Sequence, residues 1–257
     1  MPLRTISATR YVTPLREGGS MPAVIEADDQ GMYVLKFRGA GQGPKALIAE
    51  LVAGGIARAL DLPVPEIVLA ELDADLARTE GDPEIQHLIR ASAGLNLALD
   101  YLPGAVNFDP VAEQPTTDLA SRIVWFDAYV SNVDRTARNT NLLMWHRQLY
   151  LIDHGAALYF HHGWDGRSAG ADKPFILIKD HVLLPWAEKL AQADEELAAK
   201  LDRRVIADIV AQVPDTWLES NDAFAGPAEQ RDAYVDYLVL RLAQRQAFVQ
   251  EAIRARA

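Results

Sequence analysis

Apolar and polar positions in the first hundred residues follow the short patterns of β-strands, interrupted by one long helical pattern. PAVIEADDQGMYVLKF holds two β-rich runs on either side of the turn-forming cluster DDQG and predicts a hairpin. KALIAELVAGGIARAL repeats its apolar residues at helical spacing and follows Pro44, and proline is a favoured first residue of a helix. DLPVPEIVLAEL and LNLALDYLPG predict two more strands, with a short helix at DPEIQHLIRAS between them. The pattern therefore predicts a small β-rich unit with one prominent helix.

The rest of the chain has mostly helical apolar spacing. Its last stretch, roughly residues 227–256, predicts one long amphipathic helix. The exception is the central pair NLLMW and LYLID, which predicts a β-hairpin. A proline-glycine break separates the two patterns and predicts an N-terminal lobe over residues 1–98, a hinge over 99–105 and a C-terminal lobe over 106–257. Strands followed by helices predict an α+β fold.

The composition limits the kind of protein. A chain of 257 residues is long enough for one large domain or for two lobes that share a cleft. It has no cysteine, which excludes disulfides, thiolate nucleophiles and zinc–thiolate sites. No stretch approaches the ~18–20 consecutive apolar residues that cross a bilayer, and MPLRTISATRYV lacks the apolar core of a signal peptide. We therefore expect a cytoplasmic protein.

The charge narrows the range of partners. Aspartate and glutamate number 36 against 25 lysines and arginines, which gives a formal net charge of −11. Nonspecific binding to nucleic acid or to an anionic membrane rewards a basic surface. We expect neither as a partner, and an anionic ligand would need a local cation or metal ion to offset the surrounding field.

Five polar residues occur in the order that phosphoryl transfer from ATP requires. Lys36 stands in the apolar run YVLKF, and Glu50 borders the apolar stripe of the helix that follows. Asp134 precedes Asn139 by five positions before the central hairpin, and Asp153 follows the hairpin in LIDHG. In such sites a strand lysine contacts the phosphates and a helix glutamate fixes it, while an aspartate orients the attacking hydroxyl. An asparagine and a second aspartate bind Mg²⁺ through oxygen. We expect these roles for the five residues in that order.

Each of these residues has an ordinary explanation when it is taken alone. A strand lysine snorkels to solvent, a glutamate on an amphipathic helix is a surface charge, and aspartate and asparagine cap turns. The hypothesis depends on all five residues together. Five residues of the required types, in the required order and on suitable elements, would otherwise need five separate coincidences. Asn141 competes with Asn139 as a metal ligand, but its place before LLMW favours the start of the hairpin. Asp127 and Asn132 flank the loop, where either support of the loop or capping explains them.

Two glycine-rich segments compete for the place over the phosphates. REGGSMP lies before the lysine strand and can fold over a nucleotide, whereas GAGQG at residues 39–43 is more simply a link from that strand to the helix. We favour the first segment, with Gly19 and Ser20 at the nucleotide. If the proline-glycine break is a hinge, the backbone of Tyr101 and Leu102 should meet the adenine.

The segments KFRGAGQGPKALIAELVAGGIARALDLPVPE, NVDRTARNTNLL and LIDHG together resemble the HipA-like kinases, and the likeness spans roughly residues 10–215. Arg135, directly after the predicted catalytic aspartate, also resembles the DR…N loop of HipA and of the phosphoinositide kinases. The resemblance implies a bilobal protein-kinase-like fold with ATP and Mg²⁺ as cofactors, and HipA itself is a serine/threonine kinase of a toxin–antitoxin pair. HipA carries an additional N-terminal subdomain involved in antitoxin contact, and the sequence before the glycine turn is too short for it.

The sequence thus predicts an ATP- and Mg²⁺-dependent phosphotransferase, foremost a HipA-like serine/threonine protein kinase that acts on a protein substrate. An antitoxin-like partner is implied by the resemblance alone. Two alternatives stay open. The same fold can phosphorylate a small molecule or a lipid, because the fold does not fix the acceptor. A nucleotide-binding pseudokinase scaffold would act through the C-terminal helices, although it usually loses at least one of the five residues.

Overall fold

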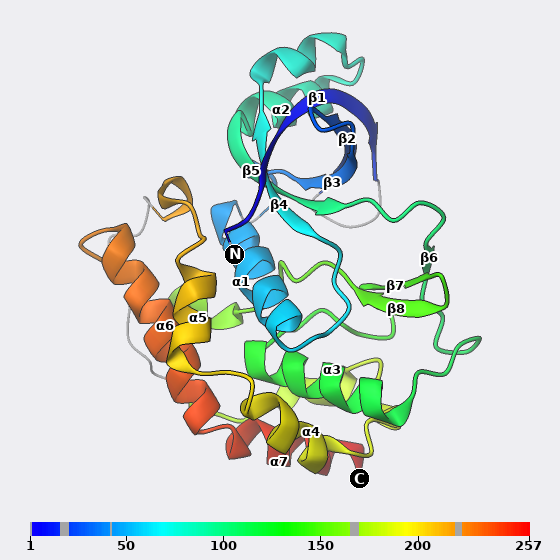
Figure 1. Cartoon of the computed structure of the whole chain (residues 1–257), viewed down its shortest axis with the longest axis vertical. Helices are drawn as coiled ribbons and strands as arrows, with labels where there is room; N and C mark the ends of the chain where they lie inside the picture. The colour runs from blue at the N-terminus through cyan, green and yellow to red at the C-terminus, as the bar shows by residue number, and fades with distance from the viewer. Residues whose placement is uncertain (1, 16–20, 42, 165–169, 219–222) are drawn as a thin grey trace.

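The computed structural model describes residues 2–15, 21–41, 43–164, 170–218 and 223–257, and its N-terminal part is a five-stranded barrel (Figure 1). The strands are β1 (Thr5–Pro14), β2 (Ala23–Ala27), β3 (Met32–Lys36), β4 (Ile67–Leu72) and β5 (Gly94–Asp100). They follow the order β1-β2-β3-β5-β4, and β1 closes the barrel by pairing in parallel with β4. The predicted hairpin is present as the antiparallel pair β2–β3.

The prominent helix α1 (Pro44–Ala59) begins at the predicted proline and lies between the barrel and the helical lobe (Figure 1). Its two central glycines allow close packing on both sides. A Cβ atom at Gly54 would lie 2.6 Å from Cδ1 of Ile67 on β4, and one at Gly55 would lie 2.7 Å from Cγ2 of Ile209. The second helix, α2 (Pro83–Ala91), packs its apolar face against the barrel interior together with the 3₁₀ segment Ala74–Thr79. The lobe therefore has its own small core, and α1 connects it to the rest.

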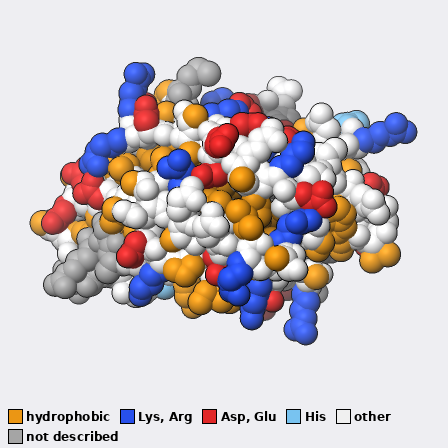
Figure 2. Space-filling view, turned by 90° about the horizontal axis from the view of Figure 1, so that it is seen from below, with side chains coloured by type: hydrophobic (Ala, Val, Ile, Leu, Met, Phe, Trp, Pro, Cys, Tyr) orange, Lys and Arg blue, Asp and Glu red, His pale blue; other side chains and the backbone are white. Residues whose placement is uncertain are grey.

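The C-terminal lobe is built around α3 (Thr117–Val130), whose residues 120–130 are all buried except one. Against it pack α4 (Leu190–Ala198), α6 (Pro227–Ala243) and α7 (Gln246–Arg256), while α5 (Arg203–Val210) packs against α6 and α1. A small sheet of β6 (Val106–Asn107), β7 (Leu142–Trp145) and β8 (Gln148–Leu151) contains the predicted central hairpin. Figure 2 shows acidic and basic side chains interspersed on one face of the molecule. Among the described residues, no helix combines the length and apolar character needed to cross a membrane.

The prediction of one helix over residues 227–256 is wrong, because the chain breaks between α6 and α7. Arg245, at the break, donates from Nε to Oδ2 of the buried Asp194 at 3.2 Å. The turn directs Phe248 against the aromatic rings of α3, and the ring centroids of Phe248 and Trp125 are 5.6 Å apart. Helical periodicity runs through both segments, so the apolar pattern alone did not reveal the break.

A buried arginine on α6 ties two separate segments together. The side chain of Arg241 donates to the carbonyl oxygens of Ala128 and Tyr129 at the end of α3, at 2.7 and 2.6 Å. It also donates to the carbonyls of Ala171 and Lys173, each at 3.2 Å. Burial lowers the pKa of Arg241, which has four carbonyl acceptors and the face of a phenylalanine ring around it. The residue therefore fixes the end of α3, which leads into residues 131–134.

We expect Arg241→Met to lower the free energy of unfolding by about 2–4 kcal/mol, because several buried carbonyls lose their donor at once. The measurement is urea denaturation of the purified protein. Arg204→Met is the matched control, since Arg204 is 88% exposed and has only a 3.9 Å contact with Asp208. A loss at Arg241 no larger than that of the control would contradict the anchoring role.

Candidate active site

Three of the predicted side chains are in contact between the lobes. Lys36, the last residue of β3, places its Nζ 2.7 Å from Oδ1 of Asp153 and 3.8 Å from Oε2 of Glu50. Burial opposes a positive charge on Lys36, but the two carboxylates outweigh it and raise the pKa of the lysine. Asp153 is the most accessible of the three, with 37% of its side chain exposed. The arrangement is a buried cation between two carboxylates, one of which faces solvent in part.

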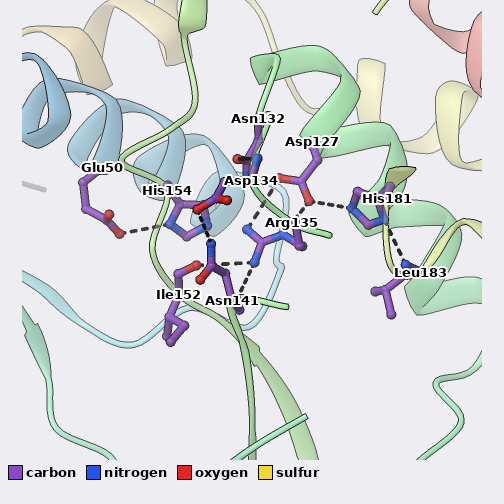
Figure 3. Close-up of polar contacts among 10 residues, drawn as sticks. All are labelled: Glu50, Asp127, Asn132, Asp134, Arg135, Asn141, Ile152, His154, His181 and Leu183. Carbon is purple, nitrogen blue, oxygen red and sulfur yellow. Dashed lines mark hydrogen bonds and ion pairs between the residues drawn. The ribbon is translucent and has the colours of Figure 1, made fainter. Parts of the chain in front are cut away.

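Glu50 has a second partner that the sequence did not indicate. Its Oε1 lies 3.2 Å from Nδ1 of His154, the residue that follows Asp153 in the chain (Figure 3). Burial disfavours the charged carboxylate, yet the charge of Lys36 and the bond from His154 hold the pKa of Glu50 well below its ordinary value. The histidine of LIDHG is fully buried. One glutamate on α1 thus contacts both the lysine strand and the segment that carries Asp153.

Asp134 lies in the loop of residues 132–141, which we call the catalytic loop. Its Oδ2 accepts from Nδ2 of Asn139 at 2.7 Å and from Nδ2 of Asn141 at 3.3 Å. Asn139 is exposed, whereas Asn141 is 8% exposed and has a φ of 48°, a left-handed conformation that asparagine tolerates. The Oδ1 of Asn132 accepts from the backbone N–H of Asp134 at 3.2 Å. Three asparagines therefore hold the predicted catalytic aspartate.

The hairpin β7–β8 joins the catalytic loop to the segment that carries Asp153. The N–H of Ile152 donates to the carbonyl of Asn141 at 3.1 Å, so the two ends of the hairpin are paired. Arg135 donates from Nη1 to the carbonyls of both residues, at 3.3 Å for Ile152 (Figure 3). The buried guanidinium therefore keeps the start and the end of the hairpin together.

The guanidinium of Arg135 also binds a buried carboxylate on α3, that of Asp127. Oδ2 of Asp127 accepts from Nε of Arg135 at 2.6 Å and from Nε2 of His181 at 2.9 Å, and Oδ1 accepts from Nδ2 of Asn132 at 2.8 Å (Figure 3). Burial opposes ionisation of Asp127, but the charge of Arg135 and the bond from His181 outweigh it and hold the pKa of Asp127 well below its ordinary value. The sequence offered support or capping as roles for Asp127 and Asn132, and gave His181 no role.

The lowered pKa of Asp127 predicts a loss of stability in acid. Its contribution is fully present above the ordinary carboxyl pKa of about 3.9 and is lost as the pH falls toward the lower folded pKa. We therefore expect the difference in unfolding free energy between wild type and Asp127→Asn to shrink below about pH 4. Urea titrations between pH 7 and pH 2.5 measure this difference, with the exposed Asp208→Asn as control. A difference that stays constant to pH 2.5 would contradict the assignment.

The remaining predicted positions lie at the edges of the site. Gly19 and Ser20 fall outside the described residues. In the predicted hinge, the N–H of Tyr101 donates to the carbonyl of Met32 at 3.0 Å, and the carbonyl of Leu102 accepts from Ala105 at 3.1 Å. The N–H of Tyr101 is thus already bonded within the protein, and the contact of the Tyr101 and Leu102 backbone with adenine stays a prediction.

Comparisons with known proteins agree with this architecture. The model of the family described as HipA-like kinase matches residues 9–251. No curated protein matches the sequence significantly. The crystal structure of a Helicobacter pylori proinflammatory kinase, CtkA, is similar with a TM-score of 0.57 at 12% identity, over 99% of this chain and 98% of that one. A Golgi casein kinase with Mn/ADP bound aligns with a TM-score of 0.49 at 11% identity, over 96% and 73%. The likeness to CtkA shows the predicted α+β, bilobal protein-kinase-like fold.

Proposed function

Because this chain belongs to the HipA-like kinase family, we propose that it transfers the γ-phosphoryl group of ATP to a serine or threonine hydroxyl of a protein. The observation that carries the proposal is the contact of Lys36 with both Glu50 and Asp153. A buried lysine with this pair of carboxylates suits phosphate binding between the lobes. Asp134 lies on the catalytic loop, and Arg135 joins this loop to the end of the β7–β8 hairpin that leads to Asp153.

Asp134 has the environment of a group that handles the acceptor. Its donors, Asn139 and Asn141, both contact Oδ2, and we assign to its carboxylate the binding and orientation of the acceptor hydroxyl. The hydroxyl oxygen attacks the γ-phosphorus, the bond to the β-phosphate oxygen breaks, and ADP leaves with that oxygen. The acceptor proton passes to Asp134. Catalysis of this kind depends mainly on positioning and on charge.

The described donors fit a divalent cation. Asp153 offers a partly exposed carboxylate, and the loop offers asparagine amide oxygens, which are hard ligands of the type that Mg²⁺ accepts. A bound Mg²⁺ would neutralise phosphate charge as it develops. The role of Lys36 is to provide positive charge to the α- and β-phosphates, and the role of Glu50 is to hold that lysine once Asp153 turns to the metal.

Experiment can decide which of Asn139 and Asn141 is the metal ligand. The sequence favours Asn139 as metal ligand, but Asn141 is buried and paired with Ile152, the residue before Asp153. We propose Asn141 as the ligand. Asn141→Gly should raise the Mg²⁺ concentration for half-maximal activity about tenfold or more, and glycine tolerates the positive φ. Asn139→Gly should change it much less. The reverse pattern would assign the metal to Asn139.

Exposed apolar side chains beside the catalytic loop favour a polypeptide acceptor. Ile176 and Leu177 are 58% and 48% exposed on the 3₁₀ segment Ile176–Asp180. That segment precedes His181, which bridges to Thr136 in the loop. Exposed apolar side chains of this kind are better suited to contact a protein surface than a polar small molecule. Small-molecule phosphorylation is the alternative.

The test is phosphotransfer by the purified protein, with radiolabelled ATP, with and without Mg²⁺. We expect Mg²⁺-dependent transfer to protein, either to itself or to added polypeptides, and mass spectrometry should locate phosphoserine or phosphothreonine. Label found only on added small alcohols would show that the acceptor is a small molecule and not a protein. Nucleotide binding without any transfer, across polypeptides and small molecules, would favour a scaffold role.

A further inference from the structure

The segment around His181 contacts the catalytic loop through its backbone. Thr136 and His181 form an isolated antiparallel bridge, and the N–H of Val182 donates to the carbonyl of Arg135 at 3.1 Å. The imidazole of His181 contacts Asp127 on α3, whose carboxylate also binds Arg135 of the loop. His181 therefore contacts the loop through its backbone and the carboxylate that organises the loop through its side chain.

The contacts of His181 define which ring nitrogen carries the proton. The backbone N–H of Leu183 donates to Nδ1 at 3.0 Å, so Nδ1 is the unprotonated acceptor (Figure 3). The proton then lies on Nε2, which is 2.9 Å from Oδ2 of Asp127 and donates to it. Burial lowers the pKa of His181, which favours the same neutral ring. A second proton on Nδ1 would face the Leu183 N–H, so the ring is held in one orientation as a donor to Asp127.

We propose that His181 is a positioning residue for Asp134, which acts by holding the Asp127 carboxylate that anchors the residues on both sides of it. The proposal rests on the proposed function. Asp127 binds Asn132 and Arg135, the second residue before Asp134 and the first residue after it. Asn132 in turn accepts from the N–H of Asp134.

The consequence of losing the His181 donor follows from this geometry. Oδ2 of Asp127 receives two donors, Nε of Arg135 and Nε2 of His181. Without His181, the carboxylate keeps its bonds to Arg135 and Asn132 but is oriented less firmly, so both flanking contacts can shift with it. A displacement of about 1 Å at a reacting group can cost ~100-fold in rate. Nucleotide binding, which depends on Lys36 and Glu50 across the cleft, is not expected to change.

Two amide variants separate the two ring nitrogens. Glutamine in place of His181 can set its amide NH₂ where Nε2 lies and so keep the donor to Asp127, whereas asparagine is shorter and replaces only the acceptor for Leu183. We expect His181→Asn to lower kcat ~10- to 100-fold with little change in the KM for ATP. His181→Gln should stay within about threefold of wild type. Equal activity of both variants, or a loss that appears in KM for ATP, would overturn the proposal.

Two further measurements do not depend on activity. In wild-type protein, the ¹⁵N shifts of the His181 ring at pH 7 should be those of a neutral ring protonated on Nε2. Amide hydrogen exchange of residues 132–137 should accelerate in His181→Asn and not in His181→Gln. A charged ring, the other tautomer, or equal exchange in both variants contradicts the inference. Absence of phosphotransfer in wild type together with the expected ring and exchange results would instead count against the proposed function alone.

Discussion

Asp134→Asn should lower phosphotransfer by ~10³-fold or more while leaving the fold and ATP binding nearly unchanged. The substitution keeps the shape of the side chain but removes the negative charge to which we assign the orientation of the acceptor hydroxyl and the uptake of its proton. The Nδ2 atoms of Asn139 and Asn141, which now donate to Oδ2 of Asp134, can donate to the new amide oxygen. We therefore expect the variant to keep its free energy of unfolding and to lose phosphotransfer.

The measurement combines initial rates of phosphotransfer with calorimetric titration of Mg²⁺-ATP. Asp208→Asn is the matched control, because Asp208 is an exposed carboxylate on α5. We expect the control to keep full activity and both proteins to bind nucleotide with similar affinity. Transfer by Asp134→Asn at more than about a tenth of the wild-type rate would remove Asp134 from the role of proton acceptor.

Arg135→Met should be the most destabilising single change at the site, with a loss of about 3–5 kcal/mol in the free energy of unfolding. Arg135 and Asp127 are both fully buried, so methionine leaves a carboxylate without the cation that offsets its desolvation. The carbonyls of Asn141 and Ile152 also lose the guanidinium as a donor, and the hairpin ends lose one of the contacts that hold them together.

A double-mutant cycle with Asp127→Asn measures the coupling directly. Because asparagine removes the buried charge, the double variant should be clearly more stable than the sum of the two single losses predicts. Arg78→Met, at a side chain that is 77% exposed, is the control and should cost less than about 0.5 kcal/mol. Additive losses at Asp127 and Arg135 would show that the pair is not coupled.

Local signals in the sequence predicted much of the fold. Pro44 marked the start of α1, the alternating runs around DDQG gave β2 and β3, and the central hairpin lies where NLLMW and LYLID placed it. Closure of the barrel was not predictable, because β1 pairs with β4 across some sixty intervening residues and no local pattern encodes that choice. The break before Arg245 was missed for a similar reason, since the partner of Arg245 at the break, Asp194, lies on α4 and is distant in sequence.

At the candidate site, too, the features with a local sequence signal were predicted and those that depend on distant partners were not. Chain order and element type singled out Lys36, Glu50 and Asp153, which the structure brings into contact, and their roles stay predictions. His154 and His181 were passed over, because a single buried histidine has no periodicity and its function lies in partners distant in sequence. A signal was present in retrospect for His154, which directly follows the predicted metal aspartate.

The short span between the ends of the central hairpin has a consequence for how the protein folds. Arg135 bonds carbonyls only 6 and 17 residues away, whereas Lys36 reaches Asp153 over 117 residues and Glu50 reaches His154 over 104. Closing short loops costs less chain entropy and is faster. The catalytic loop and the hairpin can therefore form early as a local unit. The contacts of Lys36 and Glu50 with residues 153 and 154 form only when the two lobes meet, so we expect the candidate site to be completed late in folding.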